Sequence, residues 1–165
     1  MKLLNQLDGL LNKLEGWLLI LFLSVMILLA FAQVVLRNVF SAGILWGDIL
    51  LRHLVLWIGF LGAAIATSRG RHINIDAVAR FLPVRSRQAV SIVTHLFAAA
   101  ICYLLLRASV TFIQNDIAME STVYGNIPSW YAEIIIPVGF GLLVVHFVIR
   151  ALASLQSLLR GEGAA

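Results

Sequence analysis

Four ionisable side chains interrupt long apolar runs of this 165-residue chain, and their chemistry has to be explained first. Asp48 and Arg52 stand four residues apart with the acid N-terminal, which is the favourable order along a helix. Arg107 and Glu133 lie in two later runs. Such residues form either an ion or proton path or a set of pairs that lock helices together. Because two acids balance two bases, we favour pairing, and we expect Arg107 and Glu133 to pair with each other or each with a partner chain.

The motifs of common enzyme classes are absent from the sequence. It contains no Gly-x-x-x-x-Gly-Lys-Ser/Thr phosphate loop, no Gly-x-Ser-x-Gly elbow and no His-Glu-x-x-His helix. The four histidines are too scattered to suggest a metal site. The single cysteine, Cys102, excludes an intrachain disulfide. We therefore expect a protein that is not an enzyme and that uses no cofactor or metal.

The composition indicates a membrane protein. Hydrophobic residues make up 61% of the chain and charged residues 12%, whereas a soluble domain is about half apolar and about a quarter charged. Too few polar side chains remain to cover a surface that faces water. In so apolar a chain, the net charge of +4 reports orientation in a bilayer rather than nucleic-acid binding. We expect contact with membrane lipid and no nucleic-acid partner.

Four apolar runs are long enough to cross a bilayer as helices. At about 1.5 Å per residue, about 20 residues span a hydrocarbon core, and these runs lack the alternation of barrel strands. They cover residues 17–36, 46–67, 89–112 and 130–149. Pro137 lies one turn after Glu133 and should kink the last run. The sequence predicts one membrane domain over residues 1–165, an all-α bundle of four transmembrane helices.

The basic residues predict how these helices are oriented. Nine Lys and Arg residues fall in the two tails and the middle connection, and only Arg37 falls in the other two connections. By the positive-inside rule, both termini are cytoplasmic. Counted at about 1.5 Å per residue, Asp48, Arg52, Arg107 and Glu133 then all lie within about 9 Å of the outer ends of their spans.

Two segments beside the spans have an amphipathic pattern. Leucines recur at helical spacing before Gly16, where we expect an N-terminal interfacial helix to end. In the cytoplasmic connection, apolar residues from Ile75 to Leu82 oppose Asp76 and Arg80, and Pro83 should end that short helix. This second helix either floats on the bilayer or docks a partner's cytoplasmic helix.

The order of several motifs resembles a known family. Arg37-Asn38-x-Phe40 ends the first run, and Trp46-x-Asp48-x-x-x-Arg52 begins the second. The chain continues with Trp57-x-x-Phe60-Leu61-Gly62-Ala63-Ala64, then Gly70-x-His72-Ile73-x-Ile75-Asp76, and Ile127-Pro128-x-Trp130 precedes the last run. Together they resemble the small membrane subunit (DctQ type) of TRAP transporters, the tripartite ATP-independent periplasmic uptake systems.

The resemblance implies a scaffold in the bacterial inner membrane. Such a subunit binds the large TRAP membrane subunit, whose mobile domain carries substrate, usually an organic acid, with sodium. A periplasmic solute-binding protein, the second implied partner, delivers the substrate. Partner contacts are then expected in the second run, at Trp46, Asp48, Arg52 and Trp57, and in the cytoplasmic turn, at Gly70, His72 and Asp76. Gly70 as a helix C-cap and Asp76 as a charge near a helix start remain structural alternatives.

One position departs from the family pattern, and a second function stays open. The family commonly has a glutamate three residues before the arginine, where this chain has Ile49. Asp48, one position earlier, points about 100° away around the helix. The alternative function is a self-sufficient homo-oligomeric small channel or exporter. Against it, Asp48 and Glu133 lie near one surface rather than at mid-membrane, where transport sites usually lie.

Overall fold

The computed structural model describes residues 2–68 and 84–160. Within them, four helices are long and apolar enough to cross a membrane, which confirms the predicted set of spans. They are α1 (Lys2–Phe40), α2 (Leu45–Ser68), α4 (Val84–Ala118) and α6 (Ile135–Arg160). Between α4 and α6 lie β1 (Thr122–Tyr124), β2 (Ile127–Pro128) and the four-residue helix α5 (Trp130–Glu133). The sequence analysis did not anticipate the small antiparallel hairpin of β1 and β2.

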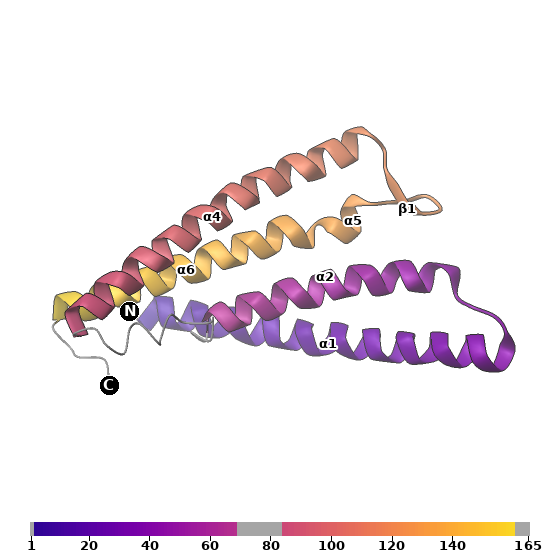
Figure 1. Ribbon diagram of the computed structural model, residues 1–165, viewed down its shortest axis with the longest axis horizontal. Helices are drawn as coiled ribbons and strands as arrows, with labels where there is room; N and C mark the ends of the chain where they lie inside the picture. Colours follow the sequence, from indigo (N-terminus) through magenta and orange to yellow (C-terminus); the bar gives the residue numbers. More distant parts are fainter. Residues whose placement is uncertain (1, 69–83, 161–165) are drawn as a thin grey trace.

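The helices form two hairpins, α1–α2 and α4–α6 (Figure 1). The hairpins converge where α1 begins and α6 ends, which we call the terminal end, and they spread apart toward the other end. We call that other end the turn end; it holds the α1–α2 turn at residues 41–44 and the β1–β2 hairpin. Contacts between the hairpins run mainly through α2 and α6. The two hairpins are therefore close together at the terminal end and farther apart at the turn end.

The first helix is longer than the sequence analysis expected. An interfacial helix ending at Gly16 and a separate span from Trp17 were predicted, but α1 runs unbroken through both segments. A single glycine costs a helix only about 1 kcal/mol relative to alanine, which is too little to stop a helix flanked by leucines. The helix α4 is also longer than expected, because it continues six residues past the predicted end at 112, to Ala118. The second predicted interfacial helix, over 75–82, lies outside the described residues.

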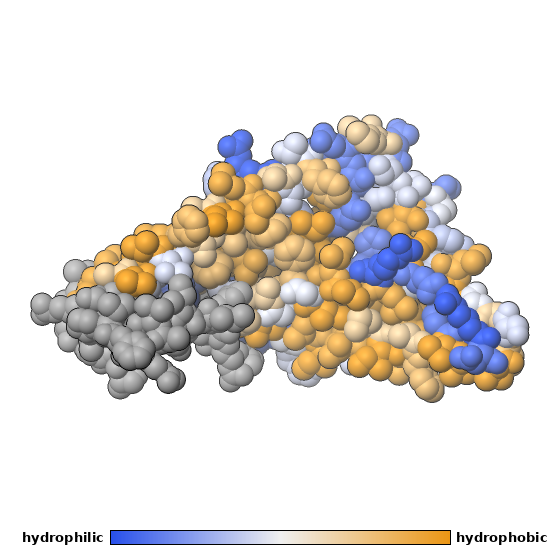
Figure 2. Space-filling model, viewed as in Figure 1, coloured by the Kyte–Doolittle hydropathy of each residue, from blue (hydrophilic) through white to orange (hydrophobic). Residues whose placement is uncertain are grey.

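The core lies where α2 packs against α6. Leu61 and Ala64 of α2 and Ile135 and Leu143 of α6 are buried. The ring of Phe60 occupies the space that a Cβ atom on Gly139 would need, so the glycine permits close approach of the two helices. Large apolar side chains on α1 and α4 are mostly exposed, as expected for surfaces that face lipid. Figure 2 shows this hydrophobic surface along the helices and hydrophilic residues gathered toward the turn end.

Candidate partner interface

Gln33 closes the turn between α1 and α2. Its side chain is buried, and its amide nitrogen donates to the carbonyl oxygen of Ile44 at 2.8 Å. The Gln33 carbonyl oxygen accepts from the Ile44 backbone N–H at 2.9 Å. Because these two bonds satisfy backbone groups that helix ends leave free, Gln33 acts as a clamp on the first hairpin.

Asp48 pairs with a different arginine from the one its spacing indicated. Its carboxylate forms an ion pair with Arg37 across the α1–α2 turn, and its second oxygen accepts from Gln33 at 3.3 Å. Arg52 reaches only the backbone oxygen of Asp48, with Nε at 3.4 Å. The expected Asp48–Arg52 pair is therefore corrected. Arg37 reaches the Asp48 carboxylate because the chain folds back at the α1–α2 turn, and helical spacing within α2 does not reveal this contact.

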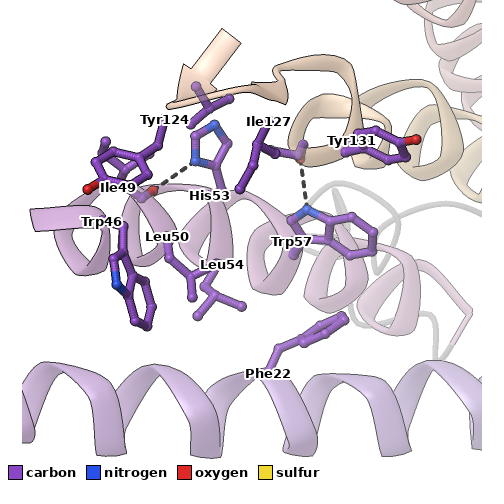
Figure 3. A pocket seen from close by; sticks show the side chains of 12 residues that line it. Phe22, Trp46, Ile49, Leu50, His53, Leu54, Trp57, Tyr124, Ile127 and Tyr131 are labelled. Atoms are coloured by element: carbon purple, nitrogen blue, oxygen red, sulfur yellow. Dashed lines mark hydrogen bonds between the residues drawn. The ribbon is translucent and has the colours of Figure 1, made fainter. Parts of the chain in front are cut away.

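Ile49, the position that departs from the family pattern, faces a different neighbourhood from Asp48. Its side chain lines an apolar pocket, together with Trp46 and His53 (Figure 3). Asp48 faces the α1–α2 turn instead. Asp48 and Ile49 therefore have different neighbours, as expected of a rotation of about 100° between successive helical residues.

The pocket lies between the two hairpins at the turn end and has a volume of about 610 Å³ (Figure 3). Aromatic side chains from both hairpins line it, including Trp46 and Trp57 of α2 and Tyr131 of α5. The one histidine in the lining, His53, bonds through Nδ1 to the Ile49 carbonyl oxygen at 2.8 Å. The lining is almost entirely apolar and is suited to hold hydrocarbon.

Trp57 ties the two hairpins together at the floor of this pocket. Its indole N–H donates to the Ala132 carbonyl oxygen at 2.9 Å (Figure 3). That carbonyl belongs to α5, which is separated from α6 at Ile134. The break confirms the predicted interruption, since Pro137 has no N–H for the preceding turn. The ring also meets Phe22 of α1 edge to face, with centroids 5.2 Å apart.

Arg107 and Glu133 do not pair with each other. Arg107 is exposed on α4, eleven residues before the helix ends at Ala118, or about 16 Å along the axis. The charged residue of α4 that acts on Glu133 is Asp116, and because both side chains are acids their charges repel rather than pair. Among the described residues, Asp116 Oδ2 and Glu133 Oε2 are shielded from solvent and accept no hydrogen bond. Sequence analysis missed Asp116 because it ended the helix at residue 112.

A buried pair joins the hairpins at the terminal end. His146 Nε2 of α6 lies 3.0 Å from Glu15 Oε1 of α1, and the two residues are 1% and 3% exposed. Asn12 and Ser68 also bond, linking α1 to α2. The sequence analysis assigned the segment before Gly16, which contains Glu15, to an interfacial helix and named neither residue of this pair as a contact. The signal that could have revealed this pair was the charge of Glu15 among the apolar residues of α1, since a charge in such a position requires a partner.

Arg52 is the predicted contact residue of α2 whose charged group remains available to a partner. Its side chain is exposed, and it has no carboxylate partner among the described side chains. Trp46 is also exposed in part, at the mouth of the pocket. By contrast, Asp48 and Trp57 use their polar atoms within the chain. Gly70, His72 and Asp76, the predicted contacts of the cytoplasmic turn, lie outside the described residues.

The chain is similar over most of its length to known transport proteins. The family model described as "Tripartite ATP-independent periplasmic transporters, DctQ component" matches residues 26–157. A putative TRAP transporter small permease protein of Haemophilus influenzae is 27% identical over 164 residues, covering 97% of this chain and 99% of that protein. The ectoine TRAP transporter small permease protein TeaB of Halomonas elongata is also 27% identical, covering 94% of this chain and 81% of TeaB. The sialic acid TRAP transporter permease protein SiaT of Haemophilus influenzae is 27% identical over 139 residues, which are 83% of this chain and 22% of SiaT.

Proposed function

The chain belongs to the DctQ component family of tripartite ATP-independent periplasmic (TRAP) transporters, and from this we propose that it scaffolds the large membrane subunit of such a transporter. It is a multi-pass inner-membrane protein and a transport component. The observation that carries the scaffold role is the match to SiaT, in which the corresponding segment is part of a much longer permease chain. A small subunit and a large one that can share one chain are expected to lie in contact.

We propose that transport itself takes place in the large subunit. That subunit would take up an organic acid, delivered by a periplasmic solute-binding protein and driven by a gradient, with sodium as the coupling ion. The described polar contacts of this chain support a passive role. They gather in separate clusters, Gln33–Asp48–Arg37 near one end and Glu15–His146 near the other. Separate clusters do not make a continuous path for ions.

We propose that both termini face the cytoplasm, with residues 1–165 as one membrane domain. The structure supports this arrangement, since α1 begins and α6 ends at the terminal end. Lys13 and Arg150 also lie toward that end, in the parts of α1 and α6 that converge there. The turn end would then face the periplasm and the binding protein, and the positive-inside rule sets the direction. Gly70, His72 and Asp76 remain proposed contacts on the cytoplasmic side.

Reconstitution tests the proposed division of labour. Proteoliposomes would hold this chain alone, the large subunit alone, or both, with purified binding protein outside and an inward sodium gradient. We expect uptake of labelled organic acid only when both membrane subunits and the binding protein are present. Uptake by this chain alone would overturn the scaffold role and favour the homo-oligomeric exporter. Uptake that persists when potassium replaces sodium would contradict sodium coupling alone.

A further inference from the structure

An open groove follows the surface that α1 and α2 share on the side away from the pocket. Met26, Ile27 and Ala30 of α1 and Leu51, Arg52 and Val55 of α2 line it, and its volume is about 430 Å³. Val55 is 59% exposed and Ile27 56%, so large apolar side chains border the groove. Arg52 is its single charged residue. The groove is therefore an apolar surface that carries one positive charge.

The face of α2 beside this groove continues as small residues. Positions 52, 55, 59, 62, 63 and 66 fall on one side of the helix at 100° per residue. Gly59 is exposed, and a Cβ atom added at Gly59 or Gly62 would meet no atom within 4 Å. By contrast, Gly139 on the core face is already filled by Phe60. Small residues let helix backbones approach closely, whereas lipid chains gain nothing from them.

The charge of Arg52 also requires a counter-charge. Arg52 lies seven residues after the start of α2, about 10 Å along the helix, and its guanidinium reaches only a backbone oxygen. Asp48, the nearest acid in the sequence, is taken by Arg37 and Gln33. An arginine that faces hydrocarbon is costly unless an anion neutralises it. The required partner therefore carries a negative charge at this depth.

A second copy of this chain does not meet that requirement. A two-fold dimer through this groove would place each Arg52 against the same surface of its mate, which carries another arginine and no free acid. The remaining described acids near the turn end all belong to the other hairpin: Asp116 on α4, Glu120 between α4 and β1, and Glu133 on α5. Charge complementarity therefore favours a different protein.

We propose that the α1–α2 groove is the docking site for a transmembrane helix of the large subunit, and that this helix carries an Asp or Glu that pairs with Arg52. The inference rests on the proposed scaffold function and names the surface that performs it. Gly59 and Gly62 would let the incoming helix lie close to α2, and the groove would receive its apolar side chains. The carboxylate would fix the depth of the helix in the bilayer.

Site-specific photo-crosslinking in the assembled complex tests the placement. A benzoylphenylalanine residue replaces Val55 in the groove or, as the matched control, Phe97, which is 67% exposed on α4. We expect crosslinks to the large subunit from position 55 and none from position 97. Crosslinks from position 97 alone, to a second copy of this chain, or only to lipid would each overturn the proposal. If the unmodified chain does not co-purify with the large subunit at all, the scaffold function itself fails.

Charge and size variants test the pairing. Arg52→Glu should lower the recovery of the large subunit at least about tenfold, whereas Arg52→Lys, which keeps the charge, should retain most of it. Gly59→Leu should also reduce recovery, and Ala100→Leu on the exposed face of α4 should not. Changing the intramembrane acids of the large subunit to Lys, one at a time, should identify one that restores binding to Arg52→Glu. Normal recovery with both Arg52→Glu and Gly59→Leu would overturn the proposal, and circular dichroism of each variant checks that it folds.

Discussion

The terminal end and the turn end of the molecule hold their helices together in different ways. At the terminal end, the buried Glu15–His146 pair connects one hairpin to the other. At the turn end, the ion pair of Arg37 and Asp48 lies within the first hairpin, and its side chains are 57% and 49% exposed. Farther along α2 from the turn, the Trp57 indole N–H also donates a hydrogen bond to the other hairpin, at the Ala132 carbonyl oxygen.

The difference indicates which end packs within this chain and which end leaves surface for a partner subunit. Buried polar groups are normally satisfied, and a buried charge without a partner is costly. Among the described residues, buried carboxylate oxygens without a hydrogen bond occur at both ends, Glu15 Oε2 at the terminal end and Asp116 Oδ2 and Glu133 Oε2 at the turn end. What distinguishes the turn end is the apolar pocket between the hairpins. The terminal end thus differs in that its pair between the hairpins is buried within this chain. The turn end has the unfilled surfaces expected of a subunit.

The largest effect is expected at the Glu15–His146 pair. His146→Leu leaves the Glu15 carboxylate buried without its partner, which should lower the free energy of unfolding by about 3–5 kcal/mol. Unfolding of the purified protein in SDS measures it. The double variant Glu15→Leu/His146→Leu removes both polar groups and should recover much of the loss. A single variant as stable as the parent would show that the terminal end is not held by this pair.

The contact between α2 and α6 is expected to be the next most sensitive. Gly139→Ala places a methyl group where the Phe60 ring lies, and such overpacking typically costs about 1–3 kcal/mol. Gly141→Ala, two residues along α6, adds a methyl group in open space and serves as the control. The same SDS unfolding assay compares them. Equal stability of the two variants would argue against close packing at Gly139.

A smaller effect is expected at Trp57. Trp57→Phe keeps an aromatic ring against Phe22 but removes the hydrogen bond to Ala132, which should cost about 0.5–1.5 kcal/mol. Hydrogen exchange should also become faster in α5. Trp46→Phe is the control, because no hydrogen bond of the Trp46 indole is found among the described residues. If both variants behave alike, the indole N–H of Trp57 does not join the hairpins.

The smallest effect is expected at the Arg37–Asp48 pair. Because both side chains are about half exposed, Arg37→Ala should lower stability by less than about 1 kcal/mol, and less still at high salt. Unfolding measured at two salt concentrations tests this. A loss as large as that of His146→Leu would erase the contrast between the two ends.

Part of the candidate site could be predicted from the residues. The i, i+4 spacing singled out Asp48 and Arg52 and missed the partner that Asp48 takes, because Arg37 reaches it only across the folded turn. The interruption at Pro137 was predictable, since a missing N–H acts locally. The Trp57–Ala132 bond was not, since its two residues lie 75 positions apart in the sequence.

The sequence by itself determined the four spans, because hydropathy adds up over about 20 residues and requires no knowledge of neighbours. The tertiary structure decided which charges meet. Glu15 joins His146, and Asp116 rather than Arg107 lies near Glu133. Successive residues are rotated by about 100° around a helix axis. An error of a few residues in the predicted end of a helix therefore changes which side chains are expected to face a neighbouring helix. Composition therefore determines residence in the membrane, whereas pairing depends on the register of packed helices.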